Sequence, residues 1–115
     1  MNTREDVKAL VVLTTLANAD QGRALVRALV DARLVACGNV VTGVTSIYRW
    51  QGTVHEEGEV LVVLKTRLER WDALRAAVVA AHPYDVPELL ALPVSAGHHP
   101  YLAWLAQATD QEDAA

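Results

Sequence analysis

The 115-residue sequence lacks several features that mark familiar functional classes. It has one cysteine, Cys37, so an intramolecular disulfide is impossible and no paired-thiol zinc motif is present. A chain of this kind fits a reducing compartment, and we expect a cytoplasmic protein. Its ten basic residues are scattered and its formal net charge is -4, which argues against a nucleic-acid or anionic-membrane surface.

Long apolar runs and catalytic motifs are missing as well. The first apolar run, from Ala9 to Ala17, is too short to span a bilayer, and the acidic residues before it are unlike a signal peptide. The segment GNVVTG, residues 38–43, has two glycines but lacks the GK[ST] ending of a P-loop. No nucleophile–base pair or carboxylate dyad has a diagnostic spacing. We therefore expect a binding protein and not an enzyme.

The composition is that of one globular domain. Hydrophobic residues make up 52% and charged residues 21%, which leaves enough apolar surface for a single core in a chain of this length. We expect one domain over residues 1–115, with frayed ends at 1–7 and 110–115.

Hydrophobic periodicity predicts an α+β fold of the order β-α-β-β-α-β, followed by a short C-terminal helix. Asn18 is expected to cap the first helix and Thr66 the second, with Pro100 at the start of the last helix. The expected strands are residues 8–16, 35–50, about 53 to 64 or 66, and 89–94; the expected helices are residues 20–34, 67–81 and 101–108.

A long hairpin is the most distinctive expected element. Gln51 and Gly52 separate two β-branched and aromatic segments, so a tight turn is predicted between them, with Trp50 at the tip. Gly38 and Gly43 mark bulges or close backbone approaches in its first arm.

The element order is that of a ferredoxin-like sandwich, in which the first and third strands lie at the centre of the sheet. These strands are apolar at successive positions and hence on both faces, whereas the helices of this fold cover one face. The second face is expected to be covered by another copy of the chain.

Several blocks carry a family resemblance: residues 36–52, Glu59 through Thr66, His82 to Tyr84, Pro87-Glu88, and residues 101–104. In this order and spacing they resemble the CutA divalent-cation tolerance family. The resemblance implies a ferredoxin-like subunit in a tight homotrimer similar to the PII signalling proteins, with long hairpins packed around neighbouring subunits. It also implies a link to metal tolerance, notably of copper.

The sequence departs from the family pattern at three positions. Thr42 stands where a proline is common, which leaves Gly43 to make the bend. Copper-binding members resemble this chain at His82, but they carry a cysteine and a second histidine where this chain has Thr14 and Ala81. Copper binding is therefore expected to be weak and to need more than one histidine.

The candidate metal ligands each have a plainer alternative. His82 either contacts a ligand or packs at the end of the second helix, and Cys37 is either a ligand or a small buried side chain. His98 and His99 are either solvated loop residues or, with His55, part of a weak copper or zinc site. We expect copper or another divalent cation and no organic cofactor.

A second set of residues is expected to line a ligand cleft or a subunit interface, because aromatic rings with polar atoms suit both. One interpretation pairs Lys65 with a carboxylate inside an intersubunit cleft; the alternative leaves these charges at strand ends in water. The leading function is divalent-metal homeostasis, and the alternative is a PII-like module that binds a small anionic ligand or a protein partner. The set comprises Tyr48, Trp50, Glu59, Lys65, Tyr84, Glu88, Tyr101 and Trp104.

Overall fold

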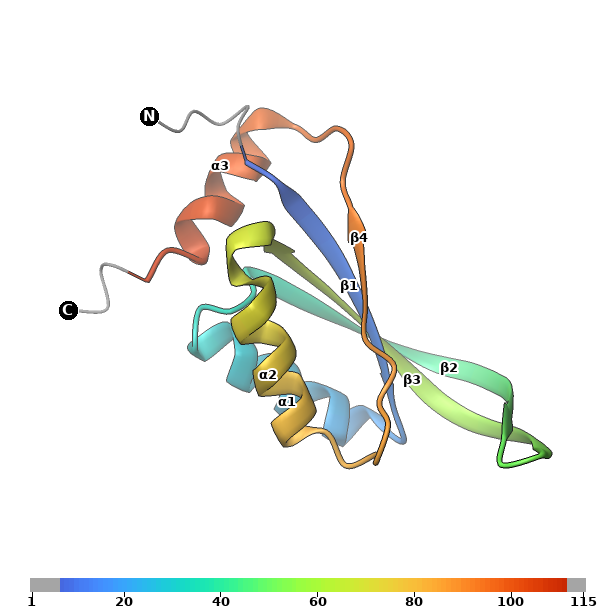
Figure 1. Cartoon of the computed structure of the whole chain (residues 1–115). Coiled ribbons are helices and arrows are strands. Elements are labelled where there is room, and N and C mark those ends of the chain that lie inside the picture. Colours follow the sequence, from blue (N-terminus) through green and yellow to red (C-terminus); the bar gives the residue numbers. More distant parts are fainter. Residues whose placement is uncertain (1–6, 112–115) are drawn as a thin grey trace.

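The computed structural model describes residues 7–111 and contains the expected order of elements (Figure 1). The ends expected to fray lie mostly outside these residues. The elements are β1 (Ala9–Leu16), α1 (Ala19–Asp31), β2 (Cys37–Trp50), β3 (Thr53–Arg67), the 3₁₀ turn η2 (Leu68–Arg70), α2 (Trp71–Ala81), β4 (Leu90–Pro93) and α3 (His99–Ala108).

The four strands form one antiparallel sheet in the order β2-β3-β1-β4. β1 and β3 are therefore central, as their continuous apolar runs predicted. Pro93 ends β4, an edge strand, where its missing N–H costs no central ladder bond. This is the ferredoxin-like arrangement that the sequence indicated.

Helices α1 and α2 cover one face of the sheet (Figure 1). Alternate residues of the central strands point to this face, so Val12 and Leu64 are fully buried, and they belong to one core with Leu74 and Val78 of α2.

The intervening residues point to the opposite side, which we call the open face. Leu90 and Leu92 there are 57% and 46% exposed, because neither α1 nor α2 lies over them. Strand register assigns to this face Val11, Leu13, Val41, Leu61, Val63, Leu90 and Leu92.

The hairpin of β2 and β3 extends well beyond the helices (Figure 1). The radius of gyration is 15.2 Å, against roughly 13 Å for a compact domain of this length. Gln51 and Gly52 both have positive φ, as a tight hairpin turn requires, and Gly43, also at positive φ, lies in the bulge between Val41 and Val44. The hairpin thus stands apart from the core of its own chain.

The helix ends agree only in part with the expectations. The Asn18 side chain accepts a hydrogen bond from the Gln21 N–H at 2.9 Å, so its capping role is confirmed. The expected cap at Thr66 is wrong: Thr66 belongs to β3, and its buried hydroxyl donates to the Leu34 carbonyl at 2.7 Å. The second helix accordingly begins with the uncapped turn η2.

Helix α3 lies at the end of the sheet away from the hairpin tip (Figure 1). Leu105 packs there in a small second core with Ala9 and Ala36. Arg67 and Arg70 donate hydrogen bonds to Thr109, just after the helix, with Nε to oxygen distances of 2.8 and 2.7 Å. These contacts fix α3 near the residues that open β2 and close β3.

Candidate functional site

His82 ends α2 and is only 8% exposed. Its Nε2 lies 2.8 Å from the carbonyl oxygen of Thr15, and its Nδ1 accepts a hydrogen bond from the Tyr84 N–H at 3.2 Å. A carbonyl only accepts, so these partners require the neutral ring with its proton on Nε2. Both nitrogens are therefore engaged by the backbone, and neither is free for a metal ion.

The other candidate metal ligands do not converge with His82. His98 and His99 are exposed at the start of α3, and Cys37 lies on β2 with its Sγ 3.6 Å from the Tyr101 hydroxyl. Within residues 7–111 no three His, Cys, Asp or Glu side chains are grouped so that they could hold a metal ion. A single chain, as far as it is described, does not form the expected ligand set.

The structure does gather several of the expected cleft residues at the hairpin. The Tyr48 hydroxyl donates to Glu57 Oε1 and the Tyr84 hydroxyl to Glu59 Oε2, each at 2.5 Å. The ring of His55 stacks on Tyr48, with 5.3 Å between centroids. We call the four hydrogen-bonded side chains the tyrosine–carboxylate cluster.

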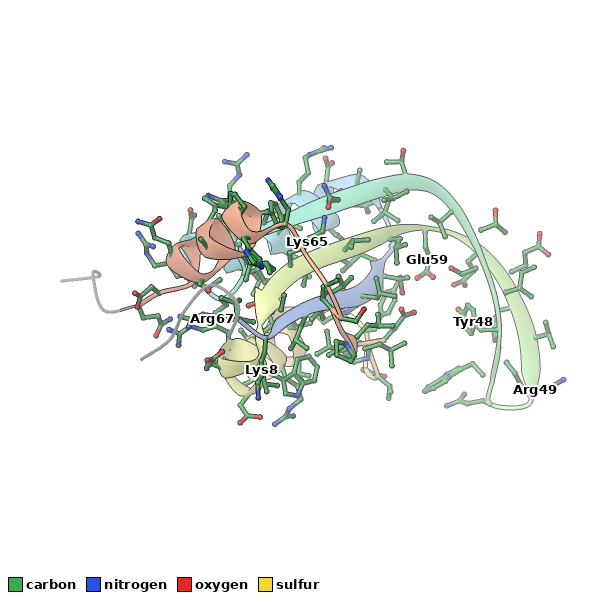
Figure 2. The ribbon with its side chains drawn as sticks, turned by 90° about the horizontal axis from the view of Figure 1, so that it is seen from above. Lys8, Tyr48, Arg49, Glu59, Lys65 and Arg67 are labelled. Carbon is green, nitrogen blue, oxygen red and sulfur yellow. The ribbon has the colours of Figure 1, made fainter. Side chains whose placement is uncertain are left out.

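This cluster lies on the concave side of the hairpin. Figure 2 shows Tyr48 and Glu59 on the inner side of the bend and Arg49 on the outer side. On β3 the residues 55, 57, 59, 61 and 63 share one face because side chains alternate along a strand. The cluster is therefore continuous with the open face of the sheet.

Both hydroxyls of the cluster are held in their protonated, donating form. Burial, followed by the hydrogen bond to Glu59, raises the pKa of Tyr84 far above its usual value. The hydrogen bond to Glu57 raises the pKa of Tyr48 in the same direction. At neutral pH each tyrosine donates a hydrogen bond to one carboxylate and so orients it.

A second group of expected residues lies at the other end of the open face, near α3. Lys65 is half-buried and its Nζ donates to the side-chain oxygen of Asn39. Cys37 pairs directly with Lys65 across β2 and β3, and its bond to Tyr101 raises the pKa of that phenol. Tyr101 in turn packs against Trp104, with 5.4 Å between ring centroids.

Trp50 and Glu88 stay apart from both groups. Trp50 lies beside the hairpin turn and is 45% exposed, and Glu88 is exposed on the segment between α2 and β4. Asn39 and Glu57 belong to these groups but were not predicted from the sequence. Glu57 lies two residues from both His55 and Glu59, and this period-two spacing on one strand face would have indicated it.

The fold and these two groups define a class of protein: a small α+β domain with a ferredoxin-like sheet, an extended β2–β3 hairpin and an uncovered apolar face. The family model described as CutA1 divalent ion tolerance protein matches residues 10–108. The chain belongs to this family. The resemblance identified from the signature blocks is therefore confirmed.

Individual relatives agree with this assignment. The divalent-cation tolerance protein CutA of Thermus thermophilus is 48% identical over 99 residues, covering 86% of this chain and 96% of that protein. The chloroplastic CutA 1 of Oryza sativa is 41% identical over 108 residues, covering 94% of this chain but only 61% of that protein. The chain thus spans almost the whole bacterial protein and about three fifths of the plant one.

Solved structures give the same result. The divalent cation tolerance protein from Thermus thermophilus superposes with a TM-score of 0.86 at 46% identity, covering 89% of this chain and 99% of that one. CutA1 from Oryza sativa superposes with a TM-score of 0.88 at 40% identity, covering 92% and 97%. In residues 7–111 no helix is long and apolar enough to cross a membrane.

Proposed function

We propose that this chain is a homotrimeric cytoplasmic protein of divalent-metal tolerance, which binds its ligands in clefts between subunits and catalyses no reaction. One observation carries the proposal: the open face is apolar along both central strands and bears both groups of candidate residues. An uncovered apolar sheet face of this kind is typical of an interface between copies. The family's connection with divalent cations supports the metal part of the proposal.

We assign metal binding to the exposed His98 and His99 and the half-buried Cys37, and not to His82. His98, His99 and Cys37 have donor atoms suited to copper or zinc, and copper prefers several nitrogen or oxygen ligands at once. Since no group of three ligands exists within residues 7–111, a bound ion would keep much of its coordination in water or take ligands from a second subunit. The proposed binding is accordingly weak.

A second candidate function is a PII-like module that binds a small anion or a protein partner at the same clefts. Lys65 favours it, because no carboxylate of residues 7–111 pairs with this half-buried ammonium. A charge on an apolar face is costly when covered unless an opposite charge reaches it. In this version metal binding is a secondary effect.

Calorimetric titration of the purified protein separates the two functions. Copper and zinc are titrated into wild type, His98→Ala and Cys37→Ser at neutral pH, and a set of nucleotides and anionic metabolites is titrated in parallel. The metal function predicts weak copper binding that each substitution reduces. Unchanged copper binding in both variants, together with saturable binding of one anion, would place the second function first.

A further inference from the structure

The two ends of the open face carry opposite charges for which residues 7–111 supply no counter-charge. At the end near α3, Lys65 is bonded to a neutral amide, that of Asn39. At the hairpin end, Glu59 is bonded to a neutral phenol, that of Tyr84. Both side chains are half-buried beside apolar residues.

These two charges cannot meet within one chain. Lys65 and Glu59 lie on the same face of the same strand, six residues apart, with Leu61 and Val63 between them. At about 3.3 Å per residue their Cα atoms are roughly 20 Å apart. Figure 2 shows Lys65 near α3 and Glu59 where the hairpin begins to bend.

Two other charges on this face of β3 have hydrogen-bond partners in their own chain. Arg67 donates to the Thr109 hydroxyl and carbonyl oxygens, and Glu57, which is exposed, accepts from Tyr48. Glu59 and Lys65 are half-buried beside Leu61 and Val63, so a partner that covers these apolar residues would desolvate both charges. Each needs an opposite charge when that happens, because a buried unpaired charge is strongly destabilising.

A second copy of the chain can supply both charges at once. When one open face meets another head to tail, the lysine end of one copy meets the carboxylate end of the next. Such a heterologous contact closes into a ring if the rotation between copies allows it, and in a ring every charge finds a partner. We propose that Lys65 of one subunit pairs with Glu59 of the next subunit, three times around the proposed trimer.

Tyr84 has a defined part in this arrangement. Its hydroxyl occupies Oε2 of Glu59, which leaves Oε1 to accept from the incoming ammonium. The contact therefore links the loop after α2 and the hairpin of one subunit to the α3 end of the next. The pairing rests on the proposed trimer and specifies which residues of each copy meet.

A double-mutant cycle with neutral substitutions tests the pairing. Lys65→Met keeps the apolar stem, and Glu59→Gln keeps an oxygen for the Tyr84 hydroxyl. The monomer–trimer equilibrium is measured by sedimentation over a dilution series, and circular dichroism checks that each variant is folded. Lys8→Met and Glu56→Gln are the matched controls, since Lys8 precedes β1 and the Glu56 side chain lies on the other face of the hairpin.

Each single substitution is expected to weaken one subunit contact about tenfold, hence the trimer about a thousandfold over its three contacts. In the double variant the affinity of each contact should fall about tenfold, and not the hundredfold that two independent effects would predict. The charge-swapped Lys65→Glu/Glu59→Lys should assemble better than Lys65→Glu alone, and the controls should assemble like wild type.

Two results would overturn the pairing while leaving the trimer intact. The first is a double variant whose loss of assembly free energy equals the sum of the losses of the two single variants. The second is a trimer that inorganic phosphate stabilises in wild type and in Glu59→Gln but not in Lys65→Met. In that case Lys65 would hold a small anion. A monomeric wild type would instead remove the proposed function itself.

Discussion

Replacing His82 by alanine separates a structural histidine from a metal ligand. The ring is 8% exposed and bridges two backbone groups, the Thr15 carbonyl and the Tyr84 N–H. Alanine removes both hydrogen bonds and leaves a small void under the loop that follows α2. Both backbone groups then lose this partner, and since Thr15 and Tyr84 are half-buried, each regains some contact with water.

The expected loss follows from these contacts. An unpaired backbone group costs about 1–3 kcal/mol when buried, and the low end applies to each of these two half-buried groups. A void of a few side-chain atoms adds about 1 kcal/mol. We expect His82→Ala to lower the free energy of unfolding by about 3 kcal/mol and to leave copper affinity within about twofold of wild type.

Urea denaturation followed by tryptophan fluorescence measures the first quantity, at one protein concentration because assembly contributes to stability. Copper titration of the folded variant measures the second. His98→Ala is the matched control, since this exposed histidine should change stability by less than about 0.5 kcal/mol. A His82→Ala protein that keeps wild-type stability but no longer binds copper would refute the structural role.

Three further changes test other parts of the structure. Tyr84→Phe should cost about 1 kcal/mol; since the pKa of Tyr84 is raised, that contribution is complete below pH about 10 and is lost as pH rises through the raised pKa. A difference titration at alkaline pH that places this phenol near its usual pKa contradicts the bond to Glu59. Gly38→Ala puts a Cβ 2.8 Å from a valine methyl of α1 and should lower the free energy of unfolding by about 1–3 kcal/mol. Gly58→Ala, with open space around the new Cβ, should be nearly neutral. Equal effects of the two changes on denaturation would refute the close packing at Gly38. Trp50→Ala should weaken assembly by more than about 2 kcal/mol, and an unchanged trimer on dilution would show that the hairpin tip is free.

The fold was predictable because its signals are local. The unbroken apolar runs of β1 and β3 predicted central strands, and Gln51-Gly52 predicted the turn between two alternating segments. Asn18 acts on the N–H three residues away, so its role also lies within a short stretch of sequence. Pattern and periodicity contain this information directly.

The errors and gaps concern long-range partners. Thr66 resembles a helix cap in sequence, but its hydroxyl bonds to Leu34, 32 residues earlier, because the strand continues past it. His82 meets the backbone of Thr15, 67 residues away, and no local pattern encodes that contact. For Lys65 the sequence suggested a carboxylate partner in an intersubunit cleft but not which carboxylate, because that choice depends on the strand face that Glu59 and Lys65 share.

Light scattering coupled to gel filtration tests most directly the central claim, that the open face is an interface between copies. One chain has a mass of 12.5 kDa. Three times that mass, maintained at micromolar concentration, is the predicted result. A particle with the mass of a single chain would contradict the account.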